Sequence, residues 1–304
     1  MAHTIVDVVV VSYRSRSQLR ACVEHLAGSD KLHVVVVDNA SDDGSLESVS
    51  DLAVTAIPLE DNRGFAAGCN AGWRAGAAPY VLLLNPDARI DEESLLRLVS
   101  AAESNERIGA VAPRILEEDG TLDYSLRRFP RVRSTLSQAF FLHRVFPRAS
   151  WSDETIRDEA RYAVEGPVEW ASGACLLIRR SLLKRLDGLD EGFFMYCEDK
   201  DLCKRIWSAG SEVRYDPAAV VVHEGGASES RSRLLGVMAA SRIRYARKHA
   251  RPLQAVLERG AVALLALTHV VVSRDGMARR AGHLHALLVA AGIRRPDYPR
   301  RSPA

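Results

Sequence analysis

Short apolar runs alternate with polar, turn-rich segments over the first third of the chain. The first run, residues 6–12, is β-branched with almost no polar alternation, which predicts a strand buried on both faces of a parallel sheet. A helical pattern follows over 17–27, and a second buried strand is predicted at 34–37. Residues 38–45 are a dense cluster of capping and turn residues, which predicts the start of another helix. This order indicates a doubly wound α/β fold.

The same alternation continues and places polar side chains at successive strand ends. A third strand is predicted at 54–59, a helix rich in small residues runs to Ala75, and a fourth strand covers 80–84. Ligands bind beyond the carboxyl ends of the strands in open α/β sheets. The residues that fall at those ends are Ser12, Asp38, Asn62 and Asp87. We therefore expect these four side chains to line one ligand-binding edge.

The second half of the chain is less regular. Residues 127–162 are rich in arginine and aromatic residues, contain several prolines and have no clean period, which predicts a variable, partly mobile insertion. Order returns with a strand at 175–178, a helix from Ser181 and a last strand at 220–222. Beyond that strand the pattern is helical to about Ile293.

Composition narrows the class of protein. Hydrophobic residues make up 47% of the chain and charged residues 26%, which is the balance of an ordinary globular protein rather than a disordered or membrane-spanning one. Lys and Arg number 41 against 39 Asp and Glu, so overall charge gives no argument for nucleic acid as a partner. Arginines are nevertheless concentrated after residue 230. Binding to anionic lipid head groups and a simple solvated helical face explain this concentration about equally well.

Two further features bear on location. The five cysteines are an odd number without a Cys-x-x-Cys pair, and the first residues lack the zones of a signal peptide, so we predict reduced thiols and a cytoplasmic protein. The apolar run 261–273 would span about 20 Å as a helix, too short for a hydrocarbon core of about 30 Å. Flanked by Arg259 and Arg274, it is expected to dip into the membrane interface, to pack on the rest of the chain, or to form a homodimer contact.

The strongest chemical signal is an acidic cluster behind an aromatic run. Glu198, Asp199 and Asp201 follow the bulky apolar residues 193–196. On a helix that begins near Cys197, Glu198 and Asp201 share a face, and Asp199 projects about 100° away from Glu198. A carboxylate against an aromatic wall has a raised pKa, which suits a general base. An acidic first helical turn also suits the helix dipole, but that explanation leaves the aromatic run unaccounted for.

Three other strand ends carry candidate ligands. Asp87 follows Asn85 and Pro86 and can hold a divalent cation that bridges the phosphates of a nucleotide-sugar, although a helix N-cap would also place an acid there. His223 can complete a metal shell, or can be a structural histidine. Asp38 with its neighbour Asn39 suits a pyrimidine base and a ribose, but turn chemistry alone also selects such residues.

Taken in order, these segments resemble the family-2 glycosyltransferases, in particular the bacterial branch whose rhamnosyltransferases build cell-wall linkers and O-antigens. The matching segments are 8–13, 37–45, 62–70, 84–87, 170–174 and 193–202. The resemblance implies a GT-A fold with a doubly wound, Rossmann-like, mostly parallel sheet and a helical C-terminal extension. It also implies a dTDP- or UDP-sugar donor, a Mg²⁺ or Mn²⁺ ion and inversion at the anomeric carbon.

The resemblance also implies roles for single residues. Asp199 matches the catalytic aspartate with Glu198 beside it, and Asp87 matches the second acid of the Asp-x-Asp motif, with Asn85 in place of the first. His223 matches a histidine that joins Asp87 at the metal. The nucleotide-sugar would contact Ser12, Tyr13, Asp38, Asn39, Asn62, Arg63, Gly64, Asn70, Asn85 and Asp87. The acceptor would contact Trp170, Ser172, Gly173, Tyr196 and Asp201.

The resemblance further divides the chain into a catalytic domain, residues 1–228, and a helical C-terminal region, residues 229–304. Within the first, 1–113 would bind the nucleotide and 114–228 would carry the acceptor and catalytic half. The motif pairing is most similar to dTDP-L-rhamnose transferases that act on a polyprenyl-diphosphate-linked or polysaccharide acceptor at the inner face of the membrane. UDP-hexose, N-acetylhexosamine and galactofuranose transferases share these motifs and stay alternatives.

Two other classes fit less well. A nucleotide-binding regulator with a degenerate site would have lost the acids that correspond to Asp87 or Asp199, and both are present. A Rossmann dehydrogenase needs a Gly-x-Gly-x-x-Gly turn after the first strand, where this chain has residues 12–15, Ser-Tyr-Arg-Ser.

Overall fold

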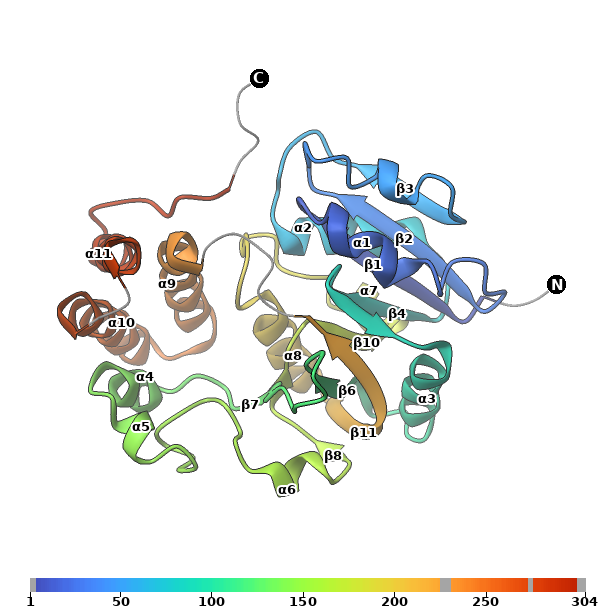
Figure 1. Cartoon of the computed structure of the whole chain (residues 1–304). Coiled ribbons are helices and arrows are strands. Elements are labelled where there is room, and N and C mark those ends of the chain that lie inside the picture. The colour runs from blue at the N-terminus through green and yellow to red at the C-terminus, as the bar shows by residue number, and fades with distance from the viewer. Residues whose placement is uncertain (1–3, 225–230, 273–275, 300–304) are drawn as a thin grey trace.

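A twisted sheet with helices on both faces forms the larger part of the molecule, seen in a computed structural model that describes residues 4–224, 231–272 and 276–299 (Figure 1). Four neighbouring strands are parallel: β3 (Val54–Pro58), β2 (Leu32–Asp38), β1 (Val6–Ser12) and β4 (Tyr80–Leu84). The sheet continues with β10 (Cys175–Arg179), β6 (Ile108–Leu116), β11 (Glu212–His223) and β5 (Ala88–Ile90), and β8 (Gly166–Pro167) pairs with β11.

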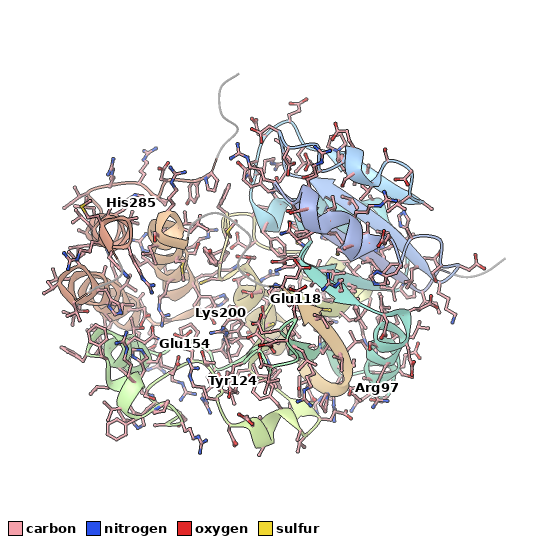
Figure 2. The ribbon with its side chains drawn as sticks, viewed as in Figure 1. Arg97, Glu118, Tyr124, Glu154, Lys200 and His285 are labelled. Carbon is pink, nitrogen blue, oxygen red and sulfur yellow. The ribbon has the colours of Figure 1, made fainter. Side chains whose placement is uncertain are left out.

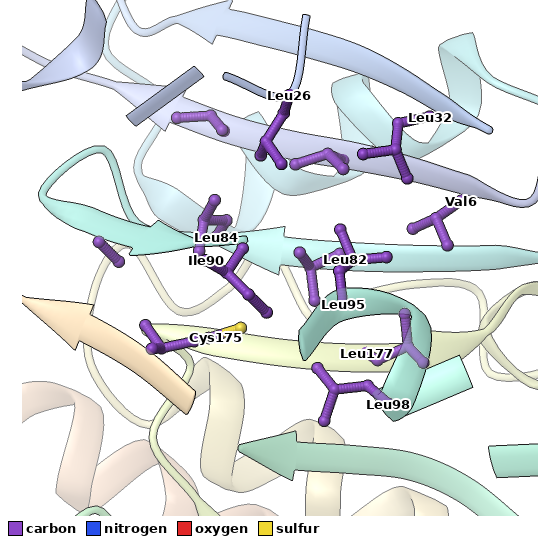
Figure 3. Packing of buried hydrophobic residues seen from close by; sticks show 14 of the residues in the cluster. Val6, Leu26, Leu32, Leu82, Leu84, Ile90, Leu95, Leu98, Cys175 and Leu177 are labelled. Atoms are coloured by element: carbon purple, nitrogen blue, oxygen red, sulfur yellow. The ribbon is translucent and has the colours of Figure 1, made fainter. Parts of the chain in front are cut away.

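The strands are apolar throughout because both faces of the sheet are covered. The helices that cover it are α1 (Arg16–Val23), α2 (Phe65–Ala75), α3 (Glu92–Glu103), α7 (Arg180–Arg185) and α8 (Glu198–Ser208). Val8 and Val10 pack in one core with α1 and α3, whereas Val9 and Val11 pack in a second core with α2, α7 and α8. Figure 3 shows the first core, with Leu95 and Leu98 of α3 against the sheet. Burial of both faces explains the missing polar alternation.

The predicted mostly parallel, doubly wound sheet is confirmed, although β10 and the short strands β5 and β8 run the other way. β10 lies between β4 and β6 and is antiparallel to both. The last strand is also longer than the predicted 220–222, because β11 contains an irregularity between Asp216 and Val220 that breaks its apolar pattern.

The helix predicted from the turn-rich segment 38–45 is wrong. Only a 3-10 turn, η1 (Glu47–Val49), forms there. The polar side chains of this segment bond to the loop after β1 instead: Ser41 Oγ accepts from Arg14 N at 2.9 Å, and Ser45 Oγ accepts from Ser15 N at 3.1 Å. Residues that commonly cap helices predict a helix start here, but in the structure their side chains join the loop after β2 to the loop after β1.

The segment predicted as an irregular insertion contains short helices, namely α4 (Val132–Ala139), α5 (Leu142–Val145) and α6 (Glu159–Tyr162). It also contains β7 (Leu126–Arg127), which pairs with β9 (Trp170–Ala171). Elements of two to eight residues are too short to show a hydrophobic period, which is why the sequence did not predict them. Mobility of this segment stays a prediction.

The chain after the sheet is helical, as predicted, and the described residues there form α9 (Arg231–His249), α10 (Pro252–Val272) and α11 (Gly276–Ala291). They share a small core of Ala239, Ile243, Val262, Ala266, Ala286 and Ala290, and α10 also packs against α4 (Figure 1). The predicted boundary at 228/229 and Arg274 lie outside the described residues. The expectation that the apolar run is too short for a membrane is wrong, because by length and composition alone the 21-residue α10 could cross one.

Candidate active site

The carboxyl ends of β1 and β2 lie side by side and carry buried polar groups. Ser12 pairs with Asp38 in the strand register, and Asn39 N donates to Ser12 O at 2.8 Å. The Ser12 hydroxyl is buried and has no hydrogen-bond partner among the described residues. Asp38 accepts from Ser41 N at 2.8 Å and from Ser41 Oγ at 2.5 Å. Burial raises the pKa of Asp38, and the bonds from Ser41 oppose that rise.

The loop before α2 is held between Asn39 and the aromatic segment. Asn39 Nδ2 donates to Gly64 O at 3.0 Å, and Asn39 Oδ1 accepts from Arg63 N at 3.1 Å. Gly64 has φ of +88°, and a Cβ there would lie 2.2 Å from Phe194 O. Phe65 N donates to that same oxygen at 2.8 Å. The side chain of Asn39 therefore positions the predicted phosphate loop instead of facing a ligand.

Asp199 lies in the first turn of α8, beside the strand end that carries Asp87. Gly173 N donates to Asp199 Oδ2 at 3.0 Å, and Lys200 N donates to Asp199 Oδ1 at 2.7 Å. The next residue after Gly173, Ala174, accepts from Asn85 N at 2.9 Å. Two hydrogen bonds thus connect Asp199 through residues 173–174 to the Asn85–Asp87 segment. Asp199 is half-buried, so it stays partly accessible to solvent.

Glu198 differs from Asp199 in being almost fully covered. It is 6% exposed, and its Oε2 atom makes no hydrogen bond among the described residues. Burial, and then the neighbouring Asp199 carboxylate, raise the pKa of Glu198 well above its usual range. Tyr196 and Cys197 both have positive φ, +66° and +68°, which turns the chain sharply before α8. The predicted raised pKa behind an aromatic segment is therefore found on Glu198.

Asp87 and His223 lie together, because β11 pairs His223 with Ala88 next to Asp87. His223 Nε2 is 3.2 Å from Asp87 Oδ1, although the geometry does not meet the criteria for a hydrogen bond. Burial lowers the pKa of His223, and Asp87 raises it by more, so the net shift is upward. No group of three His, Cys, Asp or Glu that could hold a metal occurs within residues 4–224, 231–272 and 276–299.

Three predicted ligand residues belong to the scaffold instead. All four hydrogen bonds of the Asn70 amide, with Leu189 (N and O), Glu191 and Trp73, are to protein. Asp201 is fully buried and contacts Arg205, Lys248 and His249 at 2.6 to 2.7 Å. The Trp170 ring is 7% exposed, with Lys200 Nζ 4.8 Å from its centre. These roles were mispredicted because a motif position does not show which way a side chain points.

The remaining predicted residues stay accessible at this edge. Arg63 is exposed, and its guanidinium donates to Glu191 Oε2 at 3.0 Å. Half-buried side chains are those of Tyr13, Asn62, Asn85, Ser172 and Tyr196. Glu191 also bonds to Asn70, so it ties the phosphate loop to α2. Sequence reasoning missed Glu191, although it stands just before the aromatic run.

A buried charge network behind the site was not predicted at all. Lys200, next to Asp199 on α8, contacts Glu154 at 3.3 Å, and Figure 2 shows this pair between the sheet and the C-terminal helices. Arg242 of α9 pairs with both Glu154 and Glu258, and Thr135 donates to Glu258 at 2.5 Å. The pKa of Glu154 is lowered to about 2, because Arg242 and Lys200 outweigh the effect of its burial. The network joins α8 to α4, α9 and α10.

A doubly wound sheet with an acid, a histidine and a second acidic segment beyond its strand ends is the arrangement expected of a glycosyltransferase of the GT-A type. The family model of glycosyl transferase family 2 matches residues 7–187, and the chain belongs to that family. The match ends before the Glu198–Asp199 segment, so the helix that carries Asp199 lies outside it.

Curated relatives and solved structures agree with this assignment. The chain is 33% identical over 242 residues to N-acetylglucosaminyl-diphospho-decaprenol L-rhamnosyltransferase of Mycobacterium tuberculosis, covering 75% of this chain and 78% of the relative. It is 28% identical over 231 residues to rhamnosyltransferase WbbL of Escherichia coli, covering 72% and 83%.

Solved structures share the fold at low sequence identity. The mannosyltransferase PcManGT of Pyrobaculum calidifontis, in complex with GDP-Man and Mn²⁺, has a TM-score of 0.58 at 18% identity, over 96% of this chain and 87% of that one. S. aureus TarS 1–349 with UDP-GlcNAc has a TM-score of 0.55 at 17% identity, over 95% and 81%.

Proposed function

We propose that this glycosyltransferase transfers L-rhamnose, with inversion, from dTDP-L-rhamnose to a lipid-linked acceptor at the cytoplasmic face of the membrane. The sugar is supported by two relatives, at 33% and 28% identity, that are both rhamnosyltransferases. A lipid-linked acceptor is supported by the polyprenyl-diphosphate substrate in the name of the first. A soluble polysaccharide acceptor is the alternative.

The observation that carries the proposed mechanism is the placement of Asp199. Its Oδ2 atom is held by Gly173 N, and residue 174 is bonded to the strand end that leads to Asp87. Asp199 takes the proton of the acceptor hydroxyl while that oxygen bonds to the anomeric carbon. The bond from the anomeric carbon to dTDP breaks on the opposite side, and its electron pair leaves with the diphosphate.

Glu198 supports this base without being one. Burial, and then the neighbouring Asp199 carboxylate, raise its pKa well above the usual range, so a negative charge on Glu198 beside Asp199 is disfavoured. The Arg63 guanidinium is exposed and pairs with Glu191, which is also at the surface. Such a solvent-exposed ion pair leaves the guanidinium accessible to the departing diphosphate. Arg63 therefore offsets negative charge as it develops on the leaving group.

The pair Asp87 and His223 fits a divalent cation of the Mg²⁺ or Mn²⁺ type. His223 Nε2 is buried, faces the Asp87 carboxylate and lacks a hydrogen bond, so it has an unused lone-pair position in its neutral form. Two protein ligands suffice where substrate phosphates complete the shell. A cation held there would neutralise charge on the diphosphate.

A donor panel tests the proposal. Purified protein is assayed for sugar transfer to a polyprenyl-diphosphate N-acetylglucosamine acceptor with dTDP-L-rhamnose, UDP-glucose, UDP-N-acetylglucosamine and UDP-galactofuranose. We expect the highest kcat/KM with dTDP-L-rhamnose, and loss of turnover in EDTA that Mg²⁺ or Mn²⁺ restores. A higher kcat/KM with any UDP-sugar would replace rhamnose with that sugar.

A further inference from the structure

The segment that contains α5 presents apolar and basic side chains to solvent. Phe140, Val145 and Phe146 are 58%, 68% and 48% exposed, and Arg144 and Arg148 beside them are exposed too. Residues 124–152 contain no Asp or Glu at all, but they contain six arginines. An exposed apolar segment with only positive charges is complementary to an anionic apolar surface.

Helix α10 presents a second apolar face, turned away from its own bundle. The exposed positions recur at helical spacing along its whole length: Leu253 (71%), Val256 (68%), Leu257 (51%), Leu267 (47%) and Val271 (71%). Its acid, Glu258, is instead buried and paired with Arg242. The outward face of α10 is thus the apolar one, the reverse of a surface helix in a water-soluble protein.

The two apolar faces lie on neighbouring elements, which contact each other through the inward side of α10. The ring of Phe141, just before α5, stacks 4.7 Å from the ring of His269 near the end of α10. Helices α4 and α10 also pack together, on the side of the molecule away from β3 (Figure 1). Arg144 and Arg148 supply positive charge to this surface, and neither of them forms an ion pair within the described parts of the chain.

We propose that this α5–α10 surface, residues 140–151 with the outward face of α10, docks onto a bilayer that contains anionic lipids. Helix α10 lies in the plane of the interface and does not cross it, because Glu258 fixes it to Arg242 and Thr135 in the buried network. The insertion before β8, and not the C-terminal helices alone, is then the membrane contact. This proposal rests on the proposed function only for the choice of a membrane as the partner. Vesicle binding can be measured without enzyme turnover.

Vesicle flotation tests the docking surface. The full chain is mixed with phosphatidylcholine vesicles with and without 30% phosphatidylglycerol, at low and high salt. We expect flotation with the anionic vesicles only, weakened by salt. The double variant Arg144→Gln, Arg148→Gln should bind about 30-fold more weakly, at roughly fivefold per lost cation. The matched control Arg107→Gln, Arg185→Gln removes two exposed arginines elsewhere and should bind like the parent.

The apolar half of the surface is tested in the same way. Val145→Asp should abolish flotation, whereas Val164→Asp, at a position 60% exposed on another part of the molecule, should not. Circular dichroism confirms that each variant is folded. Equal flotation of the Val145 and Val164 variants would overturn the proposal, as would a dimer that Val145→Asp converts to monomer. Retention of the protein in membranes after carbonate extraction would overturn the in-plane placement of α10.

Discussion

At the scale of single residues, the site depends on side chains that fix the conformation of its loops as much as on those expected to contact substrate. Asn39 and Glu191 keep the phosphate loop in place through its backbone and Arg63. Gly64 allows that loop to touch the backbone of Phe194, five residues before Asp199. The donor and the base are therefore positioned by one contact between two loops.

Gly64→Ala tests that contact. The added methyl group would overlap the Phe194 carbonyl, and the positive φ would be strained as well, so one of the two loops must move. A displacement of about 1 Å can cost about 100-fold in rate, and we expect a fall in kcat/KM of that order. Gly120→Ala is the matched control, since Gly120 has φ of +82° and nothing within 4 Å of the added atom. Equal kcat/KM for the two variants would show that the loop contact does not matter.

At the scale of elements, α8 is the part of the fold on which the others converge. Asp199 faces residues 173–174, Lys200 enters the buried network with Glu154, and Asp201 binds His249 of α9. Successive residues of one helical turn thus connect the site, the insertion and the C-terminal helices. Removing one partner of such a buried pair typically costs about 3–5 kcal/mol of stability.

The low pKa of Glu154 predicts how stability depends on pH. It is about 2 in the folded protein against an ordinary 4.5, so the unfolded chain binds the proton first as the pH falls. This group's stabilisation is complete above pH 4.5 and is lost on acidification towards pH 2, by about 3 kcal/mol on an order-of-magnitude basis. Urea unfolding at several pH values measures it.

The variant Glu154→Gln should lower stability at pH 7 and flatten the pH dependence between 4.5 and 2. Its control is Glu159→Gln, at an exposed acid of the same insertion. Equal pH slopes for the parent and Glu154→Gln would contradict the low pKa.

At the scale of the whole molecule, the sequence predicted the positions of the first four strands well and the insertion at 127–162 poorly. Strands such as 80–84 are continuous apolar runs with polar residues at their ends, and both features are local. The Glu154–Lys200–Arg242 network joins residues that are 46 and 88 positions apart, so no local pattern could reveal it. The direction of a side chain, as in Asn70 and Asp201, is equally invisible before the fold is known.

The site was predicted in outline for the same reason. Asp87 and His223 meet as expected, because β5 runs antiparallel beside the end of β11 and pairs Ala88 with His223. The raised pKa was expected on the base and is found on Glu198, because the turn at 196–197 buries Glu198 and leaves Asp199 half-exposed.

The most direct test of the mechanism is the turnover of Asp199→Asn. With the preferred donor and acceptor, we predict a fall in kcat of about 10²–10⁴-fold, the usual contribution of a general base, with the dissociation constant of the donor unchanged. Asp187→Asn, at a side chain that is 97% exposed, is the control and should keep the parental kcat. Near-parental kcat for Asp199→Asn, with both substrates bound normally, would contradict the assignment of Asp199 as the base.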